Sequence, residues 1–187
     1  MRVDELEPGL WRWTGLHPGW TPEEEWPQEV GSVYYEAPDA IVLFDPLVPP
    51  EDSERFWAAL DRDVERKGKR VVVALTTDSH ARSQEEILKR YGAAGGAPPA
   101  AVEAKDSTWY GERLYWLPAP GALIAGDVLL GDGVGGVRLA GSWLGDEREK
   151  VRGALLPLLD LPIERVLVTH GDPVLANGRE ALARALE

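Results

Sequence analysis

The sequence predicts a mixed α/β protein, because buried strands alternate with amphipathic helices through the first half of the chain. Ala40–Phe44 and residues 70–75 are short apolar runs rich in β-branched side chains, and such runs are typical of strands buried on both faces. Between them, Phe56, Leu60 and Val64 recur at every fourth position and predict a helix with one apolar stripe. This rhythm indicates a sheet covered by helices.

A polar loop and a second helix follow the strand at 70–75. Ser83 and Glu86 have the spacing of a capping box, in which the two side chains satisfy N–H groups at the start of a helix. Ile87 and Leu88 then lie on one side of that helix. The loop between strand and helix is dense in polar side chains, and open α/β sheets bind ligands at this end of their strands.

The second half of the chain is predicted to contain more strands and two further helices. Residues 114–118 and 122–130 read as the two strands of a hairpin, and residues 166–168 read as a last buried strand. One helix is expected to begin at Asp146, and the closing helix is expected to span residues 178–186.

The length of 187 residues fits a single domain, 1–187, with a sizeable core. The formal net charge of −12 argues against nucleic acid or an anionic membrane as the main partner. There is no cysteine, which excludes disulfides, thiolate metal ligands and cysteine nucleophiles.

The start of the chain has no apolar signal segment, and no later run is long enough to span a membrane, so we expect a cytoplasmic protein. The absence of cysteine, the single methionine and the many arginine and glutamate residues favour a heat-adapted source.

Ionisable side chains follow four of the predicted strands. Asp45 follows Ala40–Phe44, and His80 lies in the loop after the next strand; Asp127 and His170 follow two strands of the second half. If the carboxyl ends of these strands align, the four side chains share one cleft. Two imidazoles with carboxylates suit zinc, iron or manganese. Taken singly, each residue also fits a turn or loop position without a ligand.

The order of these motifs resembles the metallo-β-lactamase superfamily. The resemblance rests on segments 41–45 (IVLFD), 73–76 (VALT), 114–118 (LYWLP), 123–129 (LIAGDVL) and 166–173 (VLVTHGDP). It implies a four-layer αβ/βα sandwich: two sheets face to face, helices outside, and an active-site groove at one edge.

The resemblance does not extend to the full metal motif. Hydrolases of the family use His-x-His-x-Asp-His, an isolated histidine, the aspartate of a Gly-Asp pair and a final histidine. The four motif positions read Thr77, Ser79, Ala81 and Arg82 without a gap, or Asp78, His80, Arg82 and Ser83 after a shift of one residue. Asp127 and His170 match as ligands, with Asp45 as the supporting residue. With only three histidines in the chain, a two-metal centre of the family type is excluded.

Three interpretations remain open. In the first, His80, Asp127 and His170 hold one zinc, iron or manganese ion, and the protein hydrolyses an ester, lactone or phosphoester. In the second, no metal binds, Arg82 fills the vacated space, and the protein is a non-catalytic binding or interaction protein. In the third, His80 or His170 acts as a general base without a metal, and Arg82 stabilises an anion.

The sequence therefore predicts a hydrolase-like protein with an eroded site that binds at most one metal, and the metal-free binding protein is the alternative. Asp45 and Arg82 are the expected catalytic residues. Arg82 also precedes the helix start at Ser83, and this combination favours a small anionic ligand. The competing interpretation is that Arg82 pairs with Glu85 or Glu86 on the surface.

Overall fold

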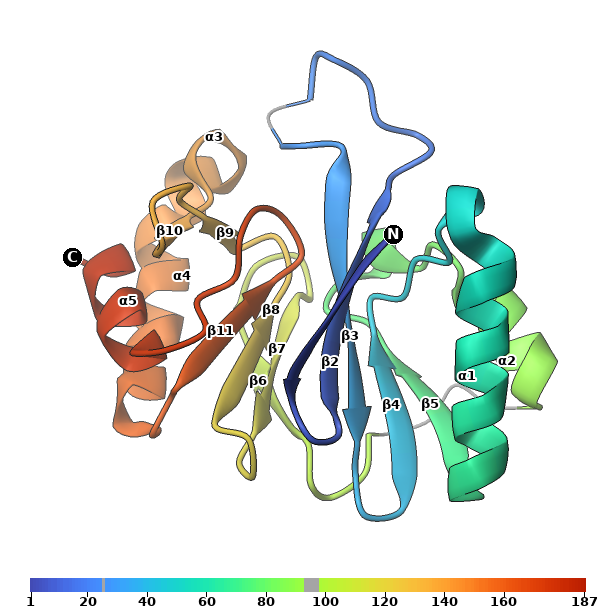
Figure 1. The fold of residues 1–187 in the computed structure, drawn as a ribbon. Coiled ribbons are helices and arrows are strands. Elements are labelled where there is room, and N and C mark those ends of the chain that lie inside the picture. The colour runs from blue at the N-terminus through green and yellow to red at the C-terminus, as the bar shows by residue number, and fades with distance from the viewer. Residues whose placement is uncertain (25, 93–97) are drawn as a thin grey trace. The chain divides into compact units, whose positions relative to one another are not determined.

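The computed structural model describes residues 1–24, 26–92 and 98–187, and its chain divides into two compact units (Figure 1). Unit 1 consists of Met1–Leu75 and Ser79–Ala101, and unit 2 of Thr76–Asp78 and Val102–Glu187. Each unit contains β-strands and helices, which confirms the mixed α/β class. That residues 1–187 form a single domain, whose two units unfold together, stays a prediction.

Unit 1 contains a five-stranded sheet whose strands follow one another in chain order. The strands are β1 (Arg2–Glu7), β2 (Leu10–Leu16), β3 (Glu29–Glu36), β4 (Ala40–Phe44) and β5 (Arg70–Ala74). Neighbours from β1 to β4 are antiparallel, whereas β4 and β5 are parallel. All five residues of β4 are buried, as the uninterrupted apolar run of its sequence predicts.

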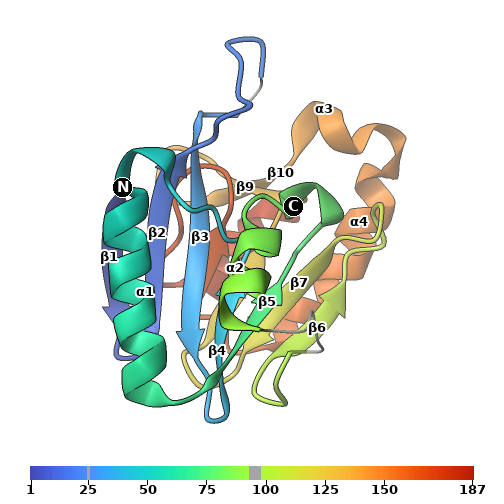
Figure 2. The ribbon, with the colours of Figure 1, turned by 90° about the vertical axis from the view of Figure 1, so that its right-hand side faces the viewer.

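Two helices cover one face of this sheet (Figure 2). They are α1 (Ser53–Lys67), which follows the 3-10 turn η1 (Pro50–Asp52), and α2 (Gln84–Tyr91). The predicted stripe of α1 buries Phe56 and Leu60, and α2 adds Ile87 to the same core. The predicted capping box is wrong in its chemistry, because the Ser83 hydroxyl accepts the N–H of Val48 at 2.9 Å and caps no helical N–H.

Unit 2 contains a four-stranded sheet in the order β11-β8-β7-β6 and a separate two-stranded ladder, β10-β9. The strands are β6 (Glu103–Asp106), β7 (Arg113–Leu117), β8 (Ala122–Ala125), β9 (Leu129–Gly131), β10 (Val137–Leu139) and β11 (Arg165–Val168). The strand predicted over 122–130 is thus two strands in different sheets. They are separated at Gly126-Asp127, where the N–H of Asp127 donates to the carboxylate of Glu112.

The helical elements of unit 2 all follow β10, and one of them leads into β11. They are α3 (Gly141–Leu144), η3 (Gly145–Glu147), α4 (Arg148–Leu155), η4 (Leu156–Asp160) and α5 (Gly178–Ala185). Val151 and Leu155 of α4 pack into one apolar core with Ala181 and Leu182 of α5. Within the described ranges, no helix combines the length and the apolar character needed to cross a bilayer.

Candidate metal centre

In unit 1, a buried carboxylate and a buried imidazole meet where two parallel strands end. Asp45 comes directly after β4, and His80 closes the short 3-10 turn η2 (Asp78–His80) that follows β5. Because β4 and β5 are parallel and in register from Ala40 to Phe44, their carboxyl ends lie at the same edge. His80 Nδ1 lies 3.0 Å from Asp45 Oδ2, and both side chains are buried.

The backbone around Asp45 is held by several hydrogen bonds. The Ser32 hydroxyl donates to the carbonyl oxygen of Asp45 at 2.8 Å, and Arg82 Nη1 donates to the same oxygen at 3.0 Å. Arg82 Nη1 also approaches the carbonyl oxygen of Gly31 at 3.4 Å. Asp45 itself has a φ of 46°, a left-handed conformation that aspartate tolerates better than most residues. Arg82 therefore lies beside Asp45, while its role toward an anion stays a prediction.

Unit 2 carries a second pair of the same kind. Asp127 lies two residues after β8, and His170 lies two residues after β11, the strand that runs parallel to β8. His170 Nε2 is 3.2 Å from Asp127 Oδ1. The indole of Trp143 meets the His170 ring edge to face, with a centroid separation of 5.9 Å. The imidazole is buried, and its carboxylate-facing nitrogen is Nε2.

Glu112 positions the turn that carries Asp127. The residue is only 1% exposed, and its carboxylate accepts the N–H of Asp127 at 3.0 Å and the N–H of Val128 at 3.1 Å. A buried carboxylate is stable only when donors compensate it, and here two consecutive main-chain donors do so. No pattern in the sequence indicates Glu112, because beside Arg113 it reads as an ordinary surface charge and nothing local connects it to Asp127.

Glycines allow the close approaches around both ligand-bearing loops of unit 2. A Cβ on Gly126 would lie 2.3 Å from Thr76 Oγ1, which is well inside contact distance. Gly171 has a φ of 84°, and a Cβ there would lie 3.0 Å from the Cα of Gly131. The N–H of Gly131 in turn donates to the carbonyl oxygen of His170 at 2.9 Å. These contacts fix the backbone on either side of the Asp127–His170 pair.

The chemistry of both pairs suits a metal ion. With Nδ1 of His80 turned toward Asp45, Nε2 is the ring atom that a metal would use, and a carboxylate behind a ligating histidine is the usual arrangement in metal sites. Two ligand atoms on one tetrahedral zinc ion lie roughly 3.3 Å apart, which agrees with the 3.2 Å between His170 Nε2 and Asp127 Oδ1. In unit 2, Asp127 and His170 offer a carboxylate oxygen and an imidazole nitrogen that could ligate a metal ion, and in unit 1 His80 offers an imidazole nitrogen of the same kind.

The structure thus brings Asp45 to His80 and Asp127 to His170. That His80 joins Asp127 and His170 as ligands of one ion stays a prediction. His17, the third histidine, lies in the loop after β2, and its Nδ1 accepts the N–H of Gly19 at 3.2 Å.

Sequence comparison alone assigns no relative: no family model and no curated protein matches the chain. Solved structures do match. A metallo-beta-lactamase from Erythrobacter litoralis has a TM-score of 0.64 at 16% identity, with 98% of this chain and 89% of that chain covered. The DIM-1 metallo-beta-lactamase has a TM-score of 0.61 at 10% identity, with 99% of this chain and 94% of that chain covered. A metallo-beta-lactamase from Hirschia baltica has a TM-score of 0.56 at 14% identity, with 99% of this chain and 95% of that chain covered.

These likenesses span nearly the whole chain at low identity. They confirm the predicted fold and the resemblance at the level of the fold: the chain has the metallo-β-lactamase fold.

Proposed function

We propose that this protein hydrolyses an ester, lactone or phosphoester with one divalent metal ion held by His80, Asp127 and His170. The observation that carries the proposal is the pairing of each histidine with a carboxylate. Asp45 holds Nδ1 of His80 at 3.0 Å, and Asp127 Oδ1 lies 3.2 Å from His170 Nε2. Two histidines and one carboxylate form the ligand set of several catalytic zinc sites.

Each supporting residue has a defined task in this proposal. Asp45 fixes the ring orientation of His80, and a carboxylate partner also makes a ligating imidazole more basic. Glu112 fixes the backbone that carries Asp127 through the N–H groups of Asp127 and Val128. When bound, the ion would supply Lewis acidity toward a carbonyl or phosphoryl oxygen of the substrate.

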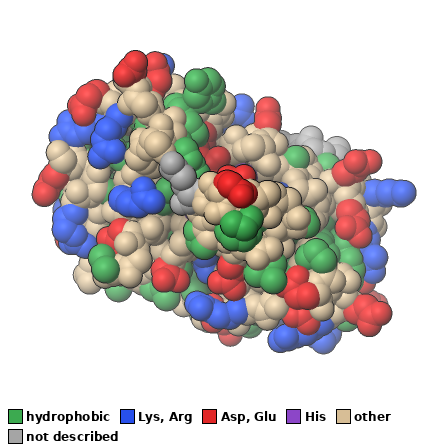
Figure 3. Space-filling view, turned by 90° about the horizontal axis from the view of Figure 1, so that it is seen from above, with side chains coloured by type: hydrophobic (Ala, Val, Ile, Leu, Met, Phe, Trp, Pro, Cys, Tyr) green, Lys and Arg blue, Asp and Glu red, His purple; other side chains and the backbone are tan. Residues whose placement is uncertain are grey.

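The substrate that we propose is a small anionic molecule. Arg82 supplies a permanent positive charge beside Asp45 and directly before Ser83, the residue that precedes α2, and a helix start and a guanidinium both favour anions. On the face shown in Figure 3, lysine and arginine side chains are interspersed with acidic ones. Such a face offers no continuous basic stripe, which supports a small substrate over nucleic acid.

A metal-free binding protein is the second candidate. It is favoured by the inventory of the chain, which has three histidines, one of them in the loop after β2. In that case the carboxylate–imidazole pairs would serve the stability of the two units and the recognition of a ligand, without chemistry.

An activity assay on metal-reconstituted protein distinguishes the two. Protein stripped with chelator is loaded with Zn²⁺, Fe²⁺ or Mn²⁺ and incubated with an anionic ester, lactone or phosphodiester: mono-p-nitrophenyl succinate, 5-oxotetrahydrofuran-2-carboxylate or bis(p-nitrophenyl) phosphate. We expect hydrolysis of one substrate class that depends on the metal, is lost in His170→Ala and is retained in His17→Ala. The proposal is contradicted if the metal-loaded protein hydrolyses none of the three substrates, or if its activity is unaffected by His170→Ala.

A further inference from the structure

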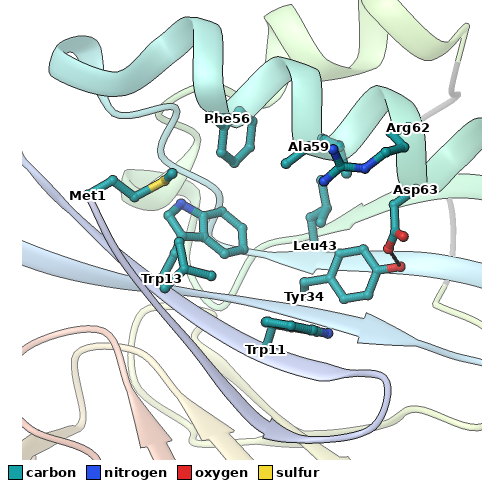
Figure 4. A pocket seen from close by; sticks show the side chains of 11 residues that line it. Met1, Trp11, Trp13, Tyr34, Leu43, Phe56, Ala59, Arg62 and Asp63 are labelled. Carbon is teal, nitrogen blue, oxygen red and sulfur yellow. Dashed lines mark hydrogen bonds between the residues drawn. The ribbon is translucent and has the colours of Figure 1, made fainter.

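Unit 1 contains an apolar pocket between the sheet and α1, with a volume of about 220 Å³ (Figure 4). Its walls are mainly aromatic and aliphatic, and they include Trp11, Trp13, Tyr34, Leu43, Phe56 and Leu60. All of these residues lie on β2, β3, β4 or α1. The pocket belongs to unit 1 alone and involves neither carboxylate–imidazole pair.

The aromatic walls are fixed by contacts of their own. The Trp13 indole N–H donates to the carbonyl oxygen of Leu47 at 2.8 Å, and its ring packs on Phe56 with a centroid separation of 5.5 Å. The Tyr34 hydroxyl donates to Asp63 Oδ2 at 2.7 Å. A pocket whose walls are already ordered loses little conformational entropy when a ligand enters.

The charged groups at the pocket rim are not equivalent. Burial of Asp63 disfavours its charged form, but hydrogen bonds from Tyr34 and Arg66 outweigh this effect and keep its pKa below the ordinary value. Asp63 is therefore a carboxylate at neutral pH whose charge Arg66 already balances. Arg62 also lines the pocket, and among the described residues no carboxylate lies within ion-pair distance of its guanidinium.

We propose that this pocket binds a small monocarboxylate with an aromatic or branched apolar body, whose carboxylate pairs with Arg62. The apolar body fills the space between Trp13, Tyr34 and Phe56. Arginine is suited to this role because its planar guanidinium donates two parallel hydrogen bonds to a carboxylate.

The volume sets the size of the ligand. A dry cavity of about 150 Å³ lined by leucine, isoleucine and phenylalanine is large enough to hold benzene. The 220 Å³ of this pocket therefore accommodates one ring with a short side chain.

The test compares three probes that share one apolar body, 3-phenylpropionate, its amide and 3-phenylpropylamine. Binding is followed by NMR at the indole N–H signals of Trp11 and Trp13 and by calorimetry. We expect saturable shifts with 3-phenylpropionate and a dissociation constant of about 1 mM or lower. The amide should bind about three- to tenfold more weakly, and the amine more weakly still.

Variants separate the charge from the cavity. Arg62→Gln should remove the advantage of the carboxylate over the amide and leave affinity for the amide unchanged. Arg55→Gln makes the same charge change on α1 outside the pocket and should have no effect. Ala59→Phe, at an exposed residue of the pocket wall, should fill the cavity and abolish binding of all three probes, with an unchanged circular dichroism spectrum as the folding control.

Three results would overturn the proposal. They are the absence of shifts at both indole signals, binding of the amine at least as tight as that of the carboxylate, and an Arg62→Gln variant that keeps the full preference for the carboxylate.

Discussion

The carboxylate of Glu112 accepts the main-chain N–H of Asp127 at 3.0 Å, and this bond joins the start of β7 to the turn after β8. The same carboxylate accepts the N–H of Val128, so Glu112 holds two consecutive residues of the turn that follows β8. A candidate ligand is thus positioned by a buried residue that holds its backbone.

We predict that Glu112→Ala lowers the free energy of unfolding by about 2–3 kcal/mol, because it removes the acceptor of the buried N–H of Val128 and of the partly buried N–H of Asp127. Glu112→Gln keeps one acceptor oxygen and should cost less. Urea denaturation measures both changes. The exposed Glu103→Gln serves as the control and should be neutral within about 0.5 kcal/mol. Equal stability of Glu112→Ala and the wild type would show that these two hydrogen bonds contribute nothing.

We predict opposite effects for two glycine-to-alanine substitutions in unit 2. Gly126→Ala places a Cβ against Thr76 Oγ1 and should destabilise the protein by about 1–3 kcal/mol. Gly153→Ala lies in α4, where a Cβ meets no atom within 4 Å, and should stabilise it by about 0.5–1 kcal/mol. Thermal unfolding of the pair gives the sign of each effect. A neutral Gly126→Ala would contradict the close approach of Thr76.

We predict that part of the stability of unit 1 is lost in acid. Hydrogen bonds from Lys67 and Lys69 lower the pKa of Glu36, with separations of 2.6 and 2.8 Å. Because the pKa of Glu36 is lower in the folded than in the unfolded protein, this contribution is present above the unfolded value of about 4.3 and disappears as the pH falls through the folded value. Glu36→Gln should therefore cost about 0.5–1 kcal/mol at pH 7.

The measurement is the free energy of unfolding of the wild type and Glu36→Gln from pH 7 to pH 3. The difference between the two proteins should shrink toward zero below about pH 4. The exposed Glu85→Gln serves as the matched control at pH 7. A difference for Glu36→Gln that stays constant with pH would show that the charge of Glu36 is not its source.

We predict that units 1 and 2 unfold together, as a single domain would. Leu43→Ala in unit 1 and Leu123→Ala in unit 2 each remove a fully buried side chain and should each cost about 2–5 kcal/mol. If the domain is single, each substitution shifts one coincident transition in circular dichroism and tryptophan fluorescence. Two separate transitions, with each substitution moving only one of them, would show that the units fold independently.

The sequence identified elements whose signal is local. The apolar run at 40–44 predicts β4, because a strand that is buried on both faces is apolar at every position. The spacing of Phe56 and Leu60 predicts α1, because a helix that is buried along one stripe is apolar at every third or fourth position. Contacts between distant residues leave no such pattern. The division of the strand predicted over 122–130 depends on Glu112, and the Ser83 hydroxyl binds Val48, 35 residues away in the chain.

In the candidate site, too, residues with a local sequence pattern could be predicted and residues positioned by distant contacts could not. Asp45, His80, Asp127 and His170 were recognisable because each follows an apolar strand, and parallel pairing of β4 with β5 and of β8 with β11 brings them into two pairs. Residues that only support these pairs, such as Trp143 behind His170, are positioned by tertiary packing and carry no sequence signal of their own.

We propose that His80 and His170 bind one and the same metal ion. The most direct test is the metal content of protein purified without chelators and reconstituted with Zn²⁺, Fe²⁺ or Mn²⁺, measured by mass spectrometry for the wild type, His80→Ala, His170→Ala and His17→Ala. We predict about one ion per chain in the wild type and in His17→Ala, and loss of that ion in both other variants. Wild-type protein without metal after reconstitution, or metal retained in either His80→Ala or His170→Ala, would contradict a shared metal site.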